Sequence, residues 1–284
     1  MKSAGARGPL ASLLKRKGQH MLGRLAVEIA GLARVAPPSL VISYLGAMVA
    51  EAPAILSSRT LAAADRRISG EVPFRIWGGV ARLDCEALDR DLLFDPSSAF
   101  GLVRELFGRN VYLRAFKPFS AHGDLAIDLG GNRGIATVLM ATAFAPATII
   151  YVEPDSRYLQ TMRTLMSAYP ETRVEAHKGF AGAAPGGTEE PLDLDAIIPE
   201  GPIAFLKMDI EGAEEPLLTG SAKWIDRVQR IAMESHPAMC DVAEVVRALE
   251  KRGFLVLPTD AVGRRCSPAD AGFVYASRSA EHFA

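Results

Sequence analysis

Short apolar runs recur along the second half of the chain, and each is followed by a glycine, a proline or a polar residue. Between them, apolar residues recur at three- and four-residue spacing, as on a helix that packs on a sheet. Strands that alternate with helices over this length predict a doubly wound, mostly parallel α/β sheet. The predicted strands are Ala126–Leu129, Thr148–Val152, Arg173–His177, Ile203–Asp209, Arg230–Glu234, Phe254–Leu257 and Phe273–Ala276.

Segments between these strands carry the signals of helices, including a short turn at Leu194–Ile198 and a helix after Glu214. Apolar residues dominate Ile135–Phe144. Asp155 is placed to cap the next helix, and we expect that helix to stop at Pro170. Val242–Leu249 shows a helical apolar stripe, and Gly253 is its expected C-cap. These helices would cover the faces of the sheet.

Residues 68–122 alternate short extended pieces with turns. Val72–Trp77 alternates apolar and polar side chains before two glycines, which predicts a strand and a turn. Ala99–Phe107 indicates a short helix, and Val111–Phe116 a second strand. We expect a mixed layer beside the ligand site that shapes the substrate pocket together with the surface loop Ala181–Pro191.

Residues 1–67 differ from the rest of the chain and are rich in Ala, Leu, Arg and Lys. Apolar residues from Leu22 to Ala33 recur at helical spacing, and Pro37 with Pro38 would end that amphipathic helix. Further helices are expected over Leu40–Val49 and around Ile55–Ala64. We therefore predict an N-terminal helical appendage, followed by the mixed layer at 68–122 and the main domain at 123–284.

The N-terminal segment is basic up to its first acidic residue, Glu28. One interpretation is an appendage that caps the main domain or mediates a homodimer. A second is a basic amphipathic helix on an anionic membrane surface, and a third is disorder or targeting. No run reaches the ~18 apolar residues of a membrane span, and no signal-peptide pattern follows the basic start. The basic residues are Lys2, Arg7, Lys15, Arg16, Lys17 and Arg24.

The composition of the chain limits which partners and which cellular compartment we expect. The net charge of −1 over 284 residues indicates no nucleic-acid binding. Cys85, Cys240 and Cys266 form no Cys-x-x-Cys pair, and the five histidines do not cluster, so no metal site is predicted. An odd, scattered set of cysteines is typical of the reducing cytoplasm. We therefore expect a cytoplasmic protein, with peripheral membrane contact left open.

A glycine turn joins the first strand of the main domain to its first helix. The stretch reads D-L-G-G-N-R-G from Asp128 to Gly134, and the next strand ends in Glu153. This is the first half of a nucleotide-binding α/β unit. A fixed carboxylate at Asp128 would repel a pyrophosphate, whereas it suits the cationic end of S-adenosylmethionine. Glu153 is placed to accept hydrogen bonds from a ribose diol, a role shared with nicotinamide enzymes, so it does not discriminate.

Acidic residues and one histidine stand at the ends of several predicted strands. In open α/β sheets, ligands bind beyond the carboxyl ends of the strands. A charged group is costly there unless it meets a partner. Each residue alone has a structural explanation, such as a helix acid for Glu214, but together they favour a functional crevice. The set is Asp128, Glu153, Asp209 with Glu211, and Glu234 with His236.

Five motifs in this order resemble the FkbM family of S-adenosylmethionine-dependent methyltransferases. They are D-L-G-G-N-R-G, V-E-P at Val152–Pro154, L-D at Leu194-Asp195, L-K-M-D-I-E-G-A-E at Leu206–Glu214 and M-E-S-H at Met233–His236. The resemblance covers roughly residues 124–277, and the K-M-D-I-E-G-A-E string is its most specific part. Gly131 departs from the usual alanine of the family. Arg133 departs from a frequent isoleucine, and would put a cation near the cofactor mouth.

The resemblance implies a Rossmann-like class I methyltransferase sheet of seven strands with the last antiparallel. It also implies O-methylation of hydroxyls on sugars, glycolipids or natural products, with S-adenosylmethionine as cofactor. Asp209 and Glu211 would face the methyl group and the substrate. As general base we consider these two carboxylates and His236. The residues implied to hold the cofactor are Asp128, Gly130, Asn132 and Gly134 at its methionine end, Glu153 at the ribose, Gly179 and Phe180 near the adenine, and Asp209.

Two other classes stay open at the level of the sequence. A nicotinamide-dependent oxidoreductase would have a third glycine in G-x-G-x-x-G and no acid at Asp128. A non-catalytic scaffold could bind adenosylmethionine, or dock on a membrane through its basic N-terminus. The sequence names neither the methyl acceptor nor the oligomeric state.

Overall fold

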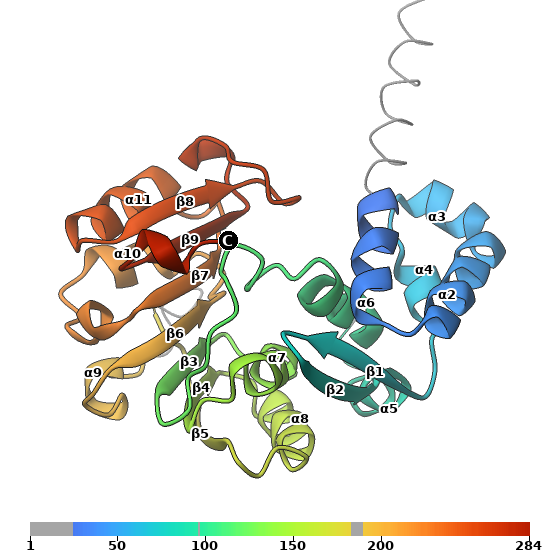
Figure 1. The fold of residues 1–284 in the computed structure, drawn as a ribbon, viewed down its shortest axis with the longest axis horizontal. Coiled ribbons are helices and arrows are strands. Elements are labelled where there is room, and N and C mark those ends of the chain that lie inside the picture. The colour runs from blue at the N-terminus through green and yellow to red at the C-terminus, as the bar shows by residue number, and fades with distance from the viewer. Residues whose placement is uncertain (1–24, 96, 183–189) are drawn as a thin grey trace, which may run out of the picture.

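The computed structural model describes residues 25–95, 97–182 and 190–284. Its centre is a seven-stranded sheet in the order β5-β4-β3-β6-β7-β9-β8 (Figure 1). Neighbouring strands are parallel except that β9 runs antiparallel to both β7 and β8. The predicted doubly wound sheet is therefore confirmed. Its strands are β3 Leu125–Leu129, β4 Thr148–Glu153, β5 Arg173–Lys178, β6 Ile203–Met208, β7 Arg230–Glu234, β8 Leu255–Thr259 and β9 Phe273–Ser277.

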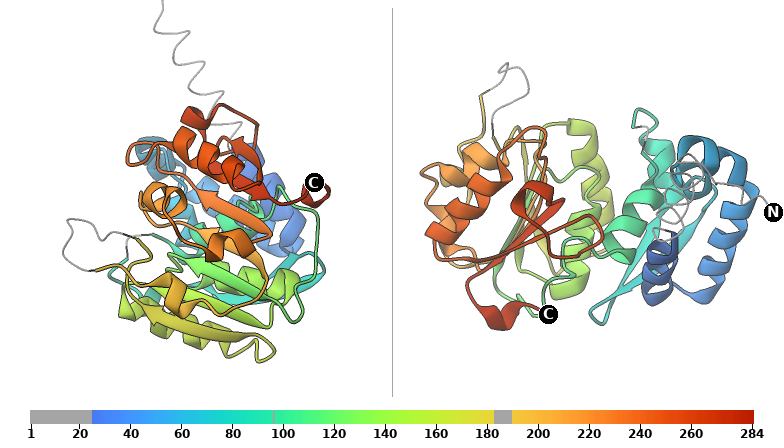
Figure 2. Two further views of the ribbon diagram at one scale, coloured as in Figure 1. Left: turned by 90° about the vertical axis from the view of Figure 1, so that its left-hand side faces the viewer. Right: turned by 90° about the horizontal axis from the view of Figure 1, so that it is seen from above.

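Helices cover both faces of this sheet, so its central strands are buried along their whole length. Every residue of β3 and β6 is buried, which explains why these runs are apolar without alternation. One face packs on α7 (Ile135–Phe144) and α8 (Ser156–Met166). The other packs on α9 (Leu194–Ile197), α10 (Glu214–Thr219) and α11 (Val242–Lys251) (Figure 2).

The predicted helices hold with small changes at their ends. The Asp155 carboxylate caps α8 by accepting from the Arg157 N–H at 2.9 Å, as expected. That helix ends at Met166, before Pro170. Gly253 follows α11 with φ +84°, the left-handed conformation that favours glycine at a helix end.

The N-terminal helices and the mixed layer share one hydrophobic core with the α7 face of the sheet. A helix over residues 25–35 precedes α2 (Pro38–Ala50), α3 (Ala52–Ser58) and α4 (Ala62–Asp65). The hairpin of β1 (Glu71–Ile76) and β2 (Gly79–Asp84) lies beside α7 (Figure 1). It leads to α5 (Cys85–Asp91), α6 (Ala99–Val103) and a π-helical turn at Arg104–Gly108.

Two predictions in this region are wrong. Val111–Phe116 is a series of turns instead of a strand. Its apolar side chains are nevertheless buried, and Phe116 packs edge-on against Phe205 and Tyr275. Burial in a coil therefore imitates the pattern of a strand. The helix expected around Ile55–Ala64 is broken at Arg59, whose φ of +59° is left-handed. Strand β2 and helix α5 were not predicted.

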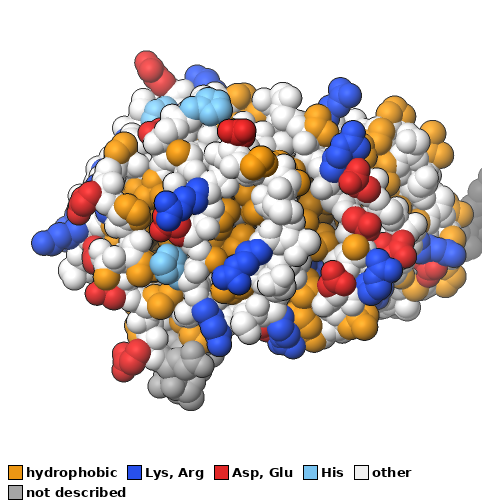
Figure 3. Space-filling model, turned by 90° about the horizontal axis from the view of Figure 1, so that it is seen from below, with side chains coloured by type: hydrophobic (Ala, Val, Ile, Leu, Met, Phe, Trp, Pro, Cys, Tyr) orange, Lys and Arg blue, Asp and Glu red, His pale blue; other side chains and the backbone are white. Residues whose placement is uncertain are grey.

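Two further observations concern the surface. No single helix in the described ranges is long and apolar enough to span a membrane; α2 and α3 meet that criterion only as a pair, and the pair is bent by 71°. Seen from below, the face in Figure 3 carries cationic and anionic side chains interspersed, without a field of one sign. That agrees with the balanced composition of the chain.

Candidate active site

A cavity of about 420 Å³ lies at the carboxyl ends of β3, β4 and β6. This is where an open α/β sheet binds its ligand, and the volume suits a small molecule or cofactor. The walls contain the predicted residues Gly130, Asn132, Glu153, Gly179, Phe180, Asp209 and Glu211. The predicted residues Asp128, Gly134 and His236 are not among the side chains that line it.

Atoms of the neighbouring strands pack directly against the glycine turn. A Cβ atom on Gly130 would stand 1.7 Å from the Asp209 carbonyl oxygen, and one on Gly131 would stand 2.0 Å from the Tyr151 ring. These glycines allow β3, β4 and β6 to meet at the turn, which sets the floor of the cavity.

Asp128 lies beneath the turn and is fully buried. Its carboxylate pairs with the Lys207 ammonium at 3.2 Å and accepts a hydrogen bond from the Thr137 hydroxyl at 2.7 Å. Lys207 also donates to the Gly130 carbonyl at 2.5 Å. Burial alone would lower the pKa of Lys207, but Asp128 and Asp209 raise it overall, so the lysine stays charged.

This placement differs from the expectation that the Asp128 carboxylate faces the cationic end of a cofactor. Its charge is offset by Lys207, so the repulsion argument against a pyrophosphate loses its basis. The structural role of Asp128 is to hold the turn through Lys207. Gly134 also has a structural role, because its Cβ would stand 2.7 Å from Met162.

Arg133 does not put a cation at the cavity mouth, which corrects the sequence interpretation. Its side chain is fully buried and pairs with Asp89 at 3.1 Å and Asp95 at 3.2 Å. It also donates to the Ser97 carbonyl at 2.8 Å. The arginine therefore fastens the segment around α5 to the start of α7, where the frequent isoleucine of the family could make no ion pair.

Glu153 borders the cavity and also ties the glycine turn to β4. One carboxylate oxygen accepts from the Asn132 N–H and the other from the Asp155 N–H, both at 2.9 Å. Burial raises the pKa of Glu153, although these two hydrogen bonds oppose the rise. Each oxygen retains further acceptor capacity, so binding of a ribose diol stays a prediction.

The structure brings together the three predicted catalytic residues. The His236 Nε2 atom lies 3.4 Å from the Glu211 carboxylate and 3.7 Å from that of Asp209. The His236 Nδ1 atom makes a 3.0 Å hydrogen bond to Glu214, which is fully buried. Glu214 is held in turn by the Ile210 N–H at 3.1 Å. A buried carboxylate thus sets the ring so that Nε2 faces the two cavity acids.

The charges of this cluster are coupled. The hydrogen bond to Glu214, with the nearby carboxylates, raises the pKa of His236 to about 9. Burial would raise the pKa of Glu214, but the hydrogen bond from His236 lowers it overall. Burial and the proximity of Asp209 raise the pKa of Glu234 to about 7. At neutral pH the imidazole is therefore protonated and neutralises part of an acidic wall.

Asp209, Glu211 and His236 are also the described residues that could hold a metal ion, because their ligand atoms lie within 4.8 Å of one another. Without a metal, the raised pKa of His236 places a protonated imidazole beside two carboxylates, and a metal ion would have to displace that proton. The prediction that the chain has no metal site stays a prediction.

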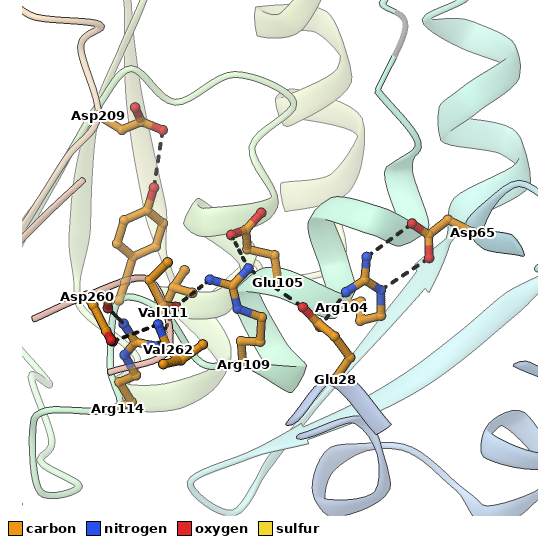
Figure 4. A network of polar contacts seen from close by, with 12 residues as sticks. Glu28, Asp65, Arg104, Glu105, Arg109, Val111, Arg114, Asp209, Asp260 and Val262 are labelled. Carbon is orange, nitrogen blue, oxygen red and sulfur yellow. Dashed lines mark hydrogen bonds and ion pairs between the residues drawn. The ribbon is translucent and has the colours of Figure 1, made fainter. Parts of the chain in front are cut away.

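Tyr112 contacts this site although the sequence did not indicate it. Its hydroxyl donates to the second Asp209 oxygen at 3.2 Å (Figure 4). The ring is buried, and it packs edge-on against Phe273. Burial and the Asp209 charge raise the pKa of Tyr112 well above its ordinary value, so it remains a donor. The segment reads as a strand in the sequence, and no local signal marks this tyrosine.

Methyltransferases are among the known proteins that this chain resembles. The model of the methyltransferase FkbM domain matches residues 187–256. A comparison with curated sequences finds no match. The solved methyltransferase FkbM from Methylobacillus flagellatus KT aligns at 20% identity with a TM-score of 0.42; the alignment covers 62% of this chain and 53%, about half, of that protein.

Two other solved structures are comparably distant. Precorrin-6y C5,15-methyltransferase from Geobacter metallireducens GS-15 aligns at 14% identity and a TM-score of 0.40, over 60% of this chain and 88% of that one. Fibrillarin from Aeropyrum pernix, solved with bound S-adenosyl-L-methionine, aligns at 16% identity and a TM-score of 0.38, over 56% and 68%. Likenesses at this level carry no argument about function. The FkbM domain match includes the whole K-M-D-I-E-G-A-E string, and it confirms the resemblance of this chain to the FkbM family of methyltransferases.

Proposed function

We propose that this chain is an S-adenosylmethionine-dependent O-methyltransferase that acts on a hydroxyl of a sugar, glycolipid or natural product. The observation that carries the proposal is one cavity with two kinds of wall. The glycine turn, Glu153 and Phe180 line one part, and the carboxylates of Asp209 and Glu211 line another. In this proposal the first part holds the cofactor and the acidic part holds the acceptor.

The residues present fit the cofactor. Glu153 offers carboxylate oxygens to a ribose, and an adenine would lie beside Gly179 and Phe180, which line the cavity. Gly179 is needed for packing, since a Cβ there would stand 2.7 Å from Leu192. The turn around Gly130 and Asn132 would take the methionine end. Asp209 and Glu211 supply negative charge for a sulfonium. When bound, S-adenosylmethionine supplies the methyl group with a good leaving group, so the protein's main task is in-line positioning.

Asp209 is the side chain best placed to take the proton of the acceptor hydroxyl. It lines the cavity, and it is held by Tyr112 on one oxygen and faced by protonated His236 on the other. A neutral alcohol is a weak nucleophile, and a fixed base assists as the bond to carbon forms. Glu211 is largely exposed and would orient the acceptor. His236 and Glu214 would keep both carboxylates in place.

The test is methyl transfer from isotope-labelled S-adenosylmethionine to a pool of hydroxylated sugars, glycolipids and natural products. We expect one product with the label on oxygen. Asp209→Asn should lower transfer by about 10²-fold or more, the usual contribution of a general base, with cofactor affinity by calorimetry retained. Glu200→Gln is the matched control, because that exposed acid lies outside the cavity lining.

The same measurements separate the competing functions. Tight binding of S-adenosylmethionine without transfer to any acceptor would indicate a scaffold. Binding of a nicotinamide dinucleotide, with none of S-adenosylmethionine, would contradict the proposal outright. Label on nitrogen or carbon would retain methyl transfer and overturn the choice of acceptor.

A further inference from the structure

Helix α2 presents an apolar face to solvent. Ile42, Leu45 and Val49 recur at three- and four-residue spacing, so they lie on one side of the helix. Their exposed fractions are 69%, 43% and 78%. Leu56 on α3 is also exposed, with 63%. None of the 13 residues of α2 carries a charge, so nothing in the helix interrupts this face.

Exposed apolar side chains are concentrated in this part of the chain. In the described ranges, ten large apolar side chains are exposed, and four of them belong to the stretch from Pro38 to Ser58. Apolar residues scattered singly over a surface need no explanation, whereas a contiguous group marks a site of interaction. We call Ile42, Leu45, Val49 and Leu56 the α2–α3 apolar face.

The opposite side of α2 anchors the helix to the fold. Leu40, Tyr44 and Ala47 are buried in the shared core, and the Tyr44 hydroxyl donates to the buried Asp65 at 2.6 Å. The 71° bend between α2 and α3 also prevents them from forming one straight rod. The pair would therefore lie along a surface, because crossing a bilayer would expose the buried tyrosine–aspartate contact to lipid.

The positive charge of the N-terminal segment indicates which partner would cover the α2–α3 apolar face. Before Glu28, the chain contains six Lys and Arg residues and no acid. Arg59, at the end of α3, is exposed. A second copy of the chain carries the same basic segment, so its charge would not complement that of the first. An anionic lipid surface offers both an apolar layer for the face and negative charge for the basic segment.

We propose that the α2–α3 apolar face docks this protein on an anionic lipid membrane, with the basic N-terminal segment adding electrostatic attraction. The surface lies outside the methyl-transfer cavity, so the inference goes beyond the proposed function. Docking would bring the enzyme to acceptors that are carried by lipids. It holds or fails independently of methyl transfer.

The test is flotation of the full chain with vesicles of phosphatidylcholine, with and without phosphatidylglycerol. We expect the wild-type chain to float only with the anionic vesicles and to be released by high salt. Val49→Asp should reduce the bound fraction several-fold, and Ile42→Asp with Val49→Asp at least tenfold. Lys15→Glu, Arg16→Glu and Lys17→Glu together should also weaken binding.

Leu93→Asp is the matched control, because that side chain is 85% exposed and lies outside α2 and α3. It should leave binding unchanged. Ile42, Val49 and Leu93 are exposed, so the variants at these positions should retain the wild-type circular dichroism spectrum. Failure of the wild-type chain to float, or equal loss in Leu93→Asp and Val49→Asp, would overturn the proposal. A dimer that Ile42→Asp with Val49→Asp dissociates, without any vesicle binding, would assign the face to a second copy instead.

Discussion

Asp209 shows how individual contacts turn an acidic residue at the end of a strand into a positioned group. The Tyr112 hydroxyl donates to one of its oxygens at 3.2 Å, and the other faces His236 at 3.7 Å. His236 is itself set by the fully buried Glu214. Two side chains that never enter the cavity therefore decide where the cavity carboxylate points.

The hydrogen bond from Tyr112 to Asp209 can be removed with almost no change in the shape of the side chain. Tyr112→Phe removes one hydroxyl, so Asp209 should lose its fixed orientation and methyl transfer should fall about tenfold. Unfolding free energy should fall by only about 1 kcal/mol, the usual net value of one hydrogen bond. Cofactor affinity by calorimetry should not change. Tyr275→Phe is the control, because that buried hydroxyl bonds to Arg114 and the Val111 carbonyl instead; equal losses of transfer in the two variants would argue against a positioning role.

The pH dependence of stability tests the Glu214–His236 pair. A free histidine titrates near pH 6.5, whereas the pKa of His236 is raised to about 9. The folded state therefore binds the proton more tightly, so this contribution is complete below about pH 6.5 and is lost as the pH rises to 9. Urea unfolding at pH 6 and pH 9 should show a loss of roughly 2 kcal/mol in the wild-type chain that His236→Gln lacks. Parallel profiles in the two proteins would contradict the pairing.

At the scale of elements, the turn between β3 and α7 depends on its packing against β4. The Tyr151 ring occupies the space that a side chain at Gly131 would need, and its hydroxyl donates to the Asn132 carbonyl. This explains physically why Gly131 replaces the alanine that is usual in the family. The residue at the turn and the residue on the neighbouring strand have to fit each other.

Gly131→Ala should therefore destabilise the fold by about 1–3 kcal/mol, because the methyl group would overlap the Tyr151 ring. Combined with Tyr151→Val, the same change should cost nothing further, so a double-mutant cycle by urea unfolding should give a large favourable coupling. Gly46→Ala, where a Cβ meets nothing within 4 Å, should be neutral or stabilising. Additive costs at Gly131 and Tyr151 would show that the ring does not exclude alanine.

At the scale of the whole molecule, polar contacts join the N-terminal helices to the rest of the chain. Arg104 bonds to Asp65 at 3.1 and 3.2 Å and pairs with Glu28, and all three side chains are largely buried. Arg109 pairs with Glu105 at 2.9 Å and reaches the Ala261 carbonyl at 2.7 Å (Figure 4). The network spans both ends of the sequence, in parallel with the shared core.

Arg104→Met should remove about 3–5 kcal/mol of stability, because it leaves the two carboxylates buried without their cation. Arg67→Met, which breaks an exposed pair with Glu51, should change it by under about 1 kcal/mol. Trp77 lies in the turn of the β1–β2 hairpin, where it contacts Phe144 of α7, and Trp224 lies in the core on the opposite face of the sheet. Variants that retain one tryptophan therefore report on each region. Two separate fluorescence transitions in the wild-type chain would show that the N-terminal part is an independent unit.

The sequence alone determined the order of strands and helices of the main domain, the glycine turn and the FkbM-type motifs. These features depend on periodicity and on spacing within short stretches, so they are visible without coordinates. The same local reasoning failed at Val111–Phe116, because apolar residues that are buried in a coil imitate the pattern of a strand. It also missed β2, which completes a hairpin outside the motifs.

Only the tertiary structure decided which acids face the cavity and which support it. Asp128 lies one residue before the end of β3 and Glu153 ends β4, yet Asp128 is paired beneath the turn with Lys207, whereas Glu153 borders the cavity. Likewise, Tyr112 reaches Asp209 across 97 residues of sequence. Such partners depend on how the chain closes on itself, because the energy of a buried charge is set by the atoms around it and these come from distant parts of the sequence.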